Sequence, residues 1–276
     1  MKQSSDGNRL FVYTRSQTQT PLANVYIITG YTGINHIAEQ DVIALLCGVS
    51  NRVVVMHPRG TGYSDGTRGD VRDYGRFMRD YIEILNEDIG HLAGNSKVIL
   101  YGHSISTAIA LHLAPSLSRV DGILLVNPPC RMKSAPGMSP TMADYVKYAA
   151  YMVFAPHKPV VNMGGDPSRI ENLAERTEAM ARASDPLLVN TISMYLMIES
   201  KKLLDQMGSA ASRSDYPLLL VYGLADSIVD REGCAEIYRL WKGSRKTFLE
   251  VPEGPHGRVT VLKARETVQL WIKSLY

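Results

Sequence analysis

Short apolar runs alternate with helical patterns along most of the chain. The central runs are apolar at every position instead of at alternate ones, which is typical of parallel strands covered on both faces. The runs lie at residues 9–14, 24–29, 52–57, 97–101, 121–126, 217–222 and 246–251. The helical patterns between them lie at residues 37–48, 75–93, 105–118, 231–242 and 260–275. This alternation predicts an α/β fold, with a mostly parallel central sheet and helices on both of its faces.

The alternation stops over residues 130–215, where two helical stretches, 140–154 and 168–206, replace a single crossover. Nine of the twelve methionines lie in this segment, together with tyrosines at a three-residue step. Flexible thioethers and aromatic rings suit an adaptable apolar pocket, although core filling explains any single methionine as well. We therefore expect a helical cap, or lid, at 130–215 on a core made of residues 1–129 and 216–276. The candidate substrate-lining residues in this cap are Tyr145, Tyr148, Met152 and Met194.

Composition narrows the class of protein. With 276 residues, 45% of them hydrophobic and 21% charged, the chain is long enough for a large α/β domain and too apolar for a disordered chain. The net charge of +3 comes without a concentrated Lys/Arg stripe, so nucleic acid is a poor candidate partner. No apolar run is long enough for a membrane span and the start is polar, so we expect a cytoplasmic protein. The three cysteines have no metal-binding spacing, and we expect no metal.

The strongest chemical signal is a serine between a predicted strand and a predicted helix. The apolar strand at 97–101 runs into the pentapeptide GHSIS at 102–106, whose centre is Ser104, and a helical pattern follows at once. A serine in such a sharp turn presents its hydroxyl above the carboxyl edge of the sheet, as a nucleophile does. Glycine is usual at both small positions of this turn, and Ser106 replaces the second one.

A second segment, at 62–66, matches the G-x-S-x-G pattern literally and has Ser64 at its centre. The residues after it are polar, contain glycine and do not begin a helix, so the structural context of a nucleophile is missing. The context therefore favours Ser104 over Ser64 as the nucleophile.

A nucleophilic serine needs a base, and the base needs an acid that orients it. In this type of fold the order along the chain is serine, acid and histidine, each in a loop after a strand. Asp226 follows the strand at 217–222, and His256 lies in a Gly- and Pro-rich loop after the strand at 246–251. Asp230 is the alternative acid, although it stands where a helix N-cap is expected.

Further groups are expected around these three side chains, because the developing oxyanion needs hydrogen-bond donors. The glycine-containing loop after strand 24–29 lies at the same edge of the sheet. The backbone N–H groups of Tyr31 and of Ile105, the residue after the nucleophile, are the natural pair. A simple strand-to-helix turn is the alternative interpretation of this loop, and nucleotide-binding spacings are missing from it. For His36 and His103, a place lining the site is as plausible as a packing role.

The segments ITGYTG, HPRGTGYSDGTRG, GHSIS, YGLADSIVD and EGPHG together resemble those of the α/β-hydrolase superfamily. More narrowly, the chain is similar to the monoacylglycerol lipase and lysophospholipase-like branch, which is also called serine aminopeptidase S33-like. The resemblance covers roughly residues 10–275 and is weakest within 130–215. Residues 59–66 match the R-G-x-G-x-S-x-G stretch of that branch, which implies that Ser64 belongs to a structural loop.

The resemblance implies an α/β-hydrolase fold with a helical cap inserted after the sixth strand. It also implies that Ser104 is the nucleophile, Asp226 the acid and His256 the base. By the same resemblance, Tyr31 and Ile105 supply the oxyanion hole.

We predict a serine hydrolase that cleaves carboxylic esters with an apolar acyl chain, monoacylglycerol- or lysophospholipid-like or related small esters, through an acyl-enzyme. Thr29 stands where the branch often has histidine, and Ser106 gives a G-x-S-x-S form that also resembles acyltransferases and thioesterases. The alternatives are therefore a thioesterase or acyltransferase for carrier- or CoA-bound chains, and a non-catalytic hydrolase-like binding protein. The expected partner is a small acyl ester or thioester, with no cofactor. The sequence leaves the oligomeric state open, and also whether the amphipathic stretch at 143–154 touches a membrane surface.

Overall fold

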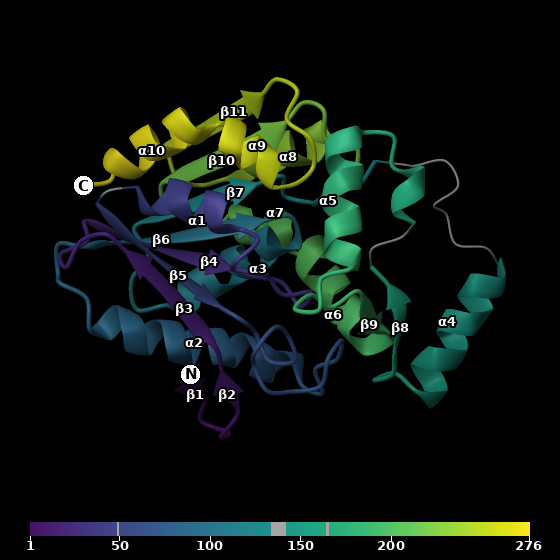
Figure 1. The fold of residues 1–276 in the computed structure, drawn as a ribbon. Coiled ribbons are helices and arrows are strands. Elements are labelled where there is room, and N and C mark those ends of the chain that lie inside the picture. The colour runs from purple at the N-terminus through teal and green to yellow at the C-terminus, as the bar shows by residue number, and fades with distance from the viewer. Residues whose placement is uncertain (49, 134–141, 164–165) are drawn as a thin grey trace.

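The computed structural model describes residues 1–48, 50–133, 142–163 and 166–276, without the side chains of residues 143–145. Its centre is a seven-stranded sheet in the order β11-β10-β7-β6-β4-β5-β3 (Figure 1). Neighbouring strands are parallel except for β3, which pairs antiparallel with β5 at one edge. The strands are β3 (Val12–Ser16), β4 (Ala23–Ile28), β5 (Asn51–Met56), β6 (Lys97–His103), β7 (Gly122–Val126), β10 (Leu218–Gly223) and β11 (Lys246–Val251).

Two short strands at the N-terminus, β1 (Lys2–Gln3) and β2 (Arg9–Leu10), form a separate antiparallel pair. The single strand expected at 9–14 is therefore divided between two sheets. Along the chain, β7 is the fifth strand of the central sheet, as it is among the apolar runs of the sequence. The inserted segment follows this fifth strand, whereas the resemblance implied the sixth.

Helices cover both faces of the sheet, which confirms the α/β architecture. Every residue of β4, β7 and β10 is buried, because each of these strands has neighbours on both sides and helices on both faces. One hydrophobic cluster lies under α1 (Gln40–Cys47), α9 (Arg258–Lys263) and α10 (Arg265–Lys273). The other lies under α2 (Tyr74–Gly90), α3 (Ile105–Leu113), the 3₁₀ helix η1 (Ala114–Ser116) and α8 (Arg231–Leu240).

We call residues 130–215, between β7 and β10, the insertion. The continuous helical stretch expected at 168–206 is wrong, because the chain breaks after α5 and forms a strand before α6. Pro186 cannot continue a helix, and the Asp185 carboxylate accepts a hydrogen bond from the Leu187 N–H at 2.8 Å, which fixes a turn. The elements are α4 (Met142–Phe154), β8 (Pro159–Asn162), η2 (Pro167–Arg169), α5 (Leu173–Ala183), β9 (Thr191–Ser193), α6 (Met194–Asp205) and α7 (Met207–Ala211).

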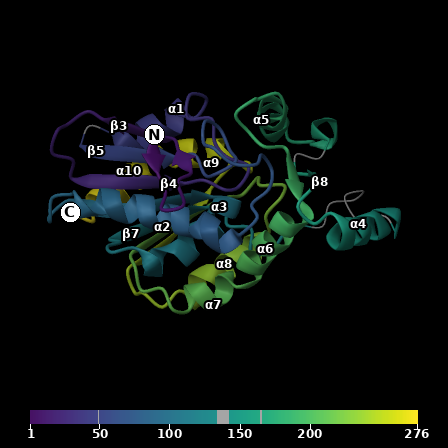
Figure 2. The same cartoon turned by 90° about the horizontal axis from the view of Figure 1, so that it is seen from below.

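The insertion is thus a mixture of helices and a short ribbon, in which β8 and β9 pair antiparallel. In both views α4 lies at the outer end of the molecule, on the far side of β8 from the central sheet (Figures 1 and 2). None of the helices within the described ranges is both long and apolar enough to cross a membrane.

Candidate active site

Ser104 lies in a sharp turn between β6 and α3. Its backbone has φ 52° and ψ −130°, a conformation that is rare for residues other than glycine and is held here by its surroundings. The Ser104 N–H donates to the Val126 carbonyl at 3.0 Å, which ties the turn to the end of β7. A Cβ atom at Gly102 would lie 2.8 Å from the Ser106 carbonyl oxygen and 2.9 Å from Thr107. Strand and helix are therefore too close for any larger residue before the turn.

The second small position of this turn accommodates a serine. Ser106 is buried, with 7% of its surface exposed, inside the first turn of α3. A Cβ atom at Gly30 would lie 2.8 Å from Cγ2 of Ile105, so the loop after β4 packs directly against the first residue of α3. This close approach brings the segments that contain Tyr31 and Ile105 together at one edge of the sheet.

His256 bridges Ser104 and Asp226. Its Nε2 lies 3.1 Å from the Ser104 hydroxyl oxygen, and its Nδ1 lies 2.8 Å from Oδ2 of Asp226. A carboxylate only accepts hydrogen bonds, so the geometry assigns the proton of the neutral ring to Nδ1. The lone pair on Nε2 then faces the hydroxyl of Ser104. The structure therefore brings together three residues that lie far apart in the sequence.

The Asp226 carboxylate is fixed on both of its oxygens. Its side chain is fully buried, and Oδ1 accepts hydrogen bonds from the backbone N–H groups of Ile228 at 2.8 Å and Val229 at 2.7 Å. Asp230, the alternative acid, caps α8 by accepting from the Glu232 N–H at 3.0 Å and pairs with Arg131. The N-cap interpretation of Asp230 is confirmed.

A residue that the sequence did not single out, Glu175 on α5, reaches the same loops. Its carboxylate accepts hydrogen bonds from the backbone N–H of His256 and from both the backbone and the hydroxyl of Ser227. The only local signal is Asn172, whose side chain caps α5 three residues earlier. Asn-x-x-Glu at the start of a helix is typical of a capping box, in which the acid accepts a hydrogen bond from the backbone N–H of the N-cap residue of its own helix.

His103 and His36, the two other histidines considered for the site, have different surroundings. The His103 ring centre lies 5.3 Å from that of His256, and its Nε2 is buried with no hydrogen-bond partner in the described part of the chain. Burial lowers the pKa of His103 well below its usual value, so the ring is neutral. His36 instead packs against Phe11, and its Nδ1 accepts a hydrogen bond from Nε2–H of His57 at 3.2 Å, because Nδ1 of His57 already accepts from the Tyr63 N–H. His103 thus lies beside the His256 ring, and His36 lies in an aromatic cluster.

The candidate substrate-lining residues of the insertion are spread over different environments. The side chain of Tyr145 lies outside the described residues. Tyr148 is half-buried against the main hydrophobic cluster, Met152 is 45% exposed on α4, and Met194 is buried at the start of α6.

A cavity of about 530 Å³ lies between α5, the loop before α1 and the start of α9, the segment that follows His256. Its lining includes Glu39, Glu178, Arg182 and Arg258, together with apolar side chains. Burial, with the nearby Glu178 charge as a second cause, raises the pKa of Glu39 to about 7. This cavity is therefore partly charged, unlike the methionine- and tyrosine-lined pocket that the sequence predicted.

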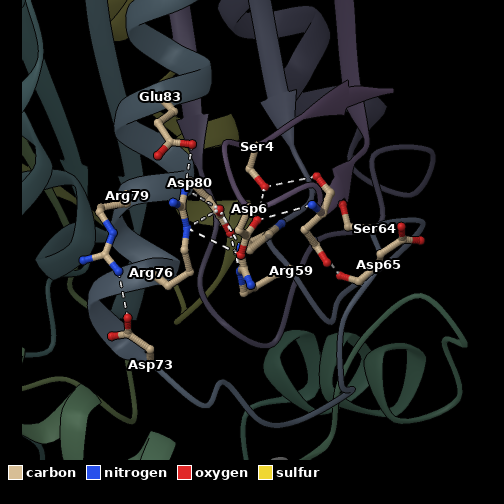
Figure 3. Close-up of polar contacts among 12 residues, drawn as sticks. Ser4, Asp6, Arg59, Ser64, Asp65, Asp73, Arg76, Arg79, Asp80 and Glu83 are labelled. Carbon is tan, nitrogen blue, oxygen red and sulfur yellow. Dashed lines mark hydrogen bonds and ion pairs between the residues drawn. The ribbon is translucent and has the colours of Figure 1, made fainter.

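Ser64 has a structural role in the loop that precedes α2. Its hydroxyl donates to the His57 carbonyl at 2.5 Å and accepts from the Phe11 N–H at 2.9 Å, and no helix follows it directly. The same loop is anchored by Arg59, which binds the buried carboxylate of Asp80 at 2.8 Å (Figure 3). Arg76 binds the same carboxylate, and Asp6 and Glu83 complete the network of ion pairs.

The described residues contain no group of three or more His, Cys, Asp or Glu side chains that could hold a metal ion. The structure instead places a hydroxyl, an imidazole and a buried carboxylate next to one another in this spatial order, Ser104, His256 and Asp226. This order of groups is the one that activates a serine for attack on a carbonyl carbon.

Comparison with known proteins places this site in a family. A family model described as serine aminopeptidase, S33 matches residues 19–260. The human monoglyceride lipase is 27% identical over 258 residues, which cover 92% of this chain and 81% of the human protein. The crystal structure of the Paleococcus ferrophilus monoacylglycerol lipase shares the fold with a TM-score of 0.75 at 22% identity, covering 96% of this chain and 99% of that chain.

A soluble variant of the monoglyceride lipase from Saccharomyces cerevisiae, in complex with a substrate analogue, shares the fold with a TM-score of 0.79. It is 17% identical, and the match covers 98% of this chain and 94% of that chain. The family model covers most of the chain, including the loops after β4, β6 and β10 and His256 itself. The chain therefore belongs to the serine aminopeptidase S33 family of α/β-hydrolases, as a lipase-like serine ester hydrolase.

Proposed function

We propose that this protein hydrolyses carboxylic esters with an apolar acyl chain, monoacylglycerol- or lysophospholipid-like or related small esters, through Ser104, His256 and Asp226. The single observation that carries the proposal is the His256 imidazole, bonded at 3.1 Å to a serine hydroxyl and at 2.8 Å to a buried carboxylate. Relatives from human and rat, 27% and 25% identical to this chain, are named monoglyceride lipase, which supports a lipid ester as substrate.

In the first step, the Ser104 oxygen attacks the ester carbonyl carbon while Nε2 of His256 takes the hydroxyl proton. Asp226 holds the ring in the correct tautomer and stabilises the imidazolium that forms. His256 then returns the proton to the leaving alcohol, which leaves an acyl group on Ser104. A water molecule, deprotonated by the same imidazole, attacks this acyl-enzyme and releases the fatty acid.

The oxyanion that forms in both steps needs hydrogen-bond donors that are already in place. We assign this role to the backbone N–H groups of Tyr31 and Ile105, because the two segments pack against each other at the Ser104 turn. Loss of one such donor costs about 3 kcal/mol of barrier in enzymes of this type.

We further propose that residues 130–215 act as a cap on a core made of 1–129 and 216–276. Support comes from backbone contacts of the insertion with two core loops. The Val189 N–H donates to the Thr32 carbonyl at 2.8 Å, beside the proposed oxyanion donor, and the Gly62 N–H donates to the Leu187 carbonyl at 3.1 Å. A cap in this place excludes water from the reacting ester.

We also propose that the alcohol part of the substrate lies in the cavity at the start of α9, whose wall includes Arg258, two residues after His256. Its volume of about 530 Å³ falls within the range of small-molecule sites. Asn35, Thr177 and Glu178 supply polar side chains to its wall, which hydroxyl groups of a leaving alcohol would hydrogen-bond.

The test is hydrolysis of monoacylglycerols and p-nitrophenyl esters from acetyl to palmitoyl, with acyl-thioesters in parallel, by the wild type and by Ser104→Ala. We expect ester turnover that peaks at one chain length and disappears in the variant. Preference for thioesters would favour the thioesterase or acyltransferase alternative. A folded wild type that turns over neither class, and whose Ser104 is inert to a fluorophosphonate, would contradict the proposal.

A further inference from the structure

Glu175 is a buried acid whose carboxylate joins the two loops that carry Asp226 and His256. One oxygen, Oε1, accepts hydrogen bonds from the backbone N–H of His256 at 2.5 Å and of Ser227 at 3.1 Å. The other oxygen, Oε2, accepts from the hydroxyl of Ser227, the residue next to Asp226. Glu175 belongs to α5 of the insertion and is only 4% exposed, so one side chain connects three separate parts of the chain.

The hydrogen bonds of the Glu175 carboxylate hold the two loops rigidly against α5. A buried carboxylate is costly unless hydrogen bonds satisfy it, and hydrogen bonds to a charged acceptor are stronger than those between neutral groups. All three donors here are neutral, two backbone N–H groups and a hydroxyl. Since two of the donors are backbone groups, the carboxylate fixes the path of the main chain and not only side-chain rotamers.

Other contacts also hold these loops, and two of them fix the peptide before His256. The Pro255 carbonyl accepts from the Thr260 hydroxyl at 2.5 Å and from the Asn127 amide at 3.3 Å. The Ala225 N–H donates to the Gly254 carbonyl at 2.9 Å, where the loops leave β10 and β11. Glu175 instead binds the backbone of His256 itself. A Cβ atom at the following residue, Gly257, would lie 2.4 Å from the Glu178 carboxylate, so α5 packs directly on this segment.

We propose that Glu175 is a positioning residue: from the insertion, it holds the backbone of His256 and Ser227 so that the imidazole reaches both Ser104 and Asp226. The inference rests on the proposed function, because it assigns Glu175 a part in aligning that triad. If Glu175 has this role, the alignment of Ser104, Asp226 and His256 depends on the docking of α5. Displacement of a catalytic group by about 1 Å costs about a hundredfold in rate.

Two variants of Glu175 separate the effect of its side-chain length from the effect of its charge. In Glu175→Gln the amide oxygen still accepts from both backbone N–H groups, and the amide NH₂ donates to the Ser227 hydroxyl. In Glu175→Asp the charge remains, but the shorter chain does not reach both loops. We expect the Gln variant to keep kcat within about threefold, while kcat of Glu175→Asp and Glu175→Ala falls by about ten- to a hundredfold. KM should change little in all three variants.

The measurement is kcat and KM on the best ester, normalised by fluorophosphonate titration of Ser104, with the proton NMR signal of the His256 Nδ1 hydrogen as a readout that needs no turnover. Glu171→Gln, an exposed acid four residues earlier, is the matched control and should behave as the wild type. We expect the Nδ1 signal to be sharp in the wild type and the Gln variant and to broaden or shift in the Asp variant.

Equal losses in the Gln and Asp variants would overturn the positioning role, and so would an Asp variant with wild-type kcat and an unchanged Nδ1 signal. These results leave the proposed function intact as long as the wild type hydrolyses esters. A wild type without ester turnover contradicts the proposed function, while the Nδ1 signals still decide the role of Glu175. If Glu175→Ala fails to fold, the contrast between Gln and Asp decides alone.

Discussion

The core and the insertion of this molecule are stabilised in different ways. In the core, entire strands such as β4, β7 and β10 are buried between two layers of helices. In the insertion, α4 leaves large apolar side chains in solvent, with Val153 72% and Phe154 85% exposed. The inner part of the insertion joins the hydrophobic cluster of the core through Ile192, Leu196 and Met207. It also meets the core loops through single polar contacts, among them those of Glu175 and of Asp70 with Ser193.

The apolar core and the polar contacts of the insertion therefore have two different roles. The apolar core fixes the ends of the strands and therefore the loops that carry the three catalytic candidates. The polar contacts of the insertion add alignment at specific points, and a single substitution removes each of them. Substitutions in the two regions should therefore differ in what they change: the catalytic groups and global stability for the core, and local docking, with the alignment of His256 that depends on it, for the insertion.

The largest effect is expected at the buried acid of the core. Asp226→Asn should lower kcat by about 10⁴-fold, because the amide no longer selects the imidazole tautomer with the proton on Nδ1. The measurement is ester hydrolysis at saturating substrate. Asp230→Asn is the matched control, since asparagine also caps a helix well, and its kcat should stay within a few-fold of the wild type. A larger loss at Asp230 than at Asp226 would reverse the assignment of the acid.

The next largest effect is a loss of folding stability when the buried carboxylate of Asp80 is removed. Asp80, whose side chain is 1% exposed, binds Arg59 and Arg76 in the network that anchors the N-terminus and the loop before α2 (Figure 3). Asp80→Ala leaves these arginines without their buried partner and should lower the free energy of unfolding by about 3–5 kcal/mol. The exposed pair of Asp205 and Lys201 in the insertion is the comparison, and Asp205→Ala should cost less than about 1 kcal/mol. Urea unfolding measures both, and similar losses would contradict the distinction between the two regions.

A smaller, local effect is expected where the insertion docks. The buried Asp70 carboxylate accepts a hydrogen bond from the Ser193 hydroxyl at 2.5 Å and lies 3.1 Å from Nδ1 of His157. Asp70→Ala removes the acceptor of the buried Ser193 hydroxyl proton and the contact with His157, and it should weaken docking by about 1–3 kcal/mol. Hydrogen exchange should become faster in β8 and β9 and stay unchanged in β4. Faster exchange throughout the core would mean that the two regions unfold as one unit.

The last effect, absent at neutral pH, is a pH dependence within the core. Burial, with the neighbouring His36 as a second cause, lowers the pKa of His57 to about 4, against about 6.5 in an unfolded chain. The unfolded state therefore binds more protons between these values, so the stability from this group is complete above pH 6.5 and is lost as the pH falls toward 4. Urea unfolding at several pH values should show a slope up to about 1.4 kcal/mol per pH unit smaller in His57→Gln than in the wild type. Identical slopes would show that His57 does not carry this proton.

The two regions also differ in how far the sequence predicts them. Ser104 and His256 were found because each follows an apolar strand, and parallel strands bring their carboxyl ends to one edge of the sheet. Glu175 was missed because its spacing from Asn172 has a complete local explanation as a capping box. The ribbon of β8 and β9 was missed because strands of four and three residues are too short for a periodic pattern.

Whether Ser104 is the nucleophile is decided by labelling the protein with a fluorophosphonate and locating the adduct by mass spectrometry of the peptides. We expect one adduct per chain, on Ser104. It should form much more slowly in Asp226→Asn and be missing in Ser104→Ala. An adduct on Ser64, or no adduct on a folded protein, would contradict the assignment of Ser104 as the nucleophile.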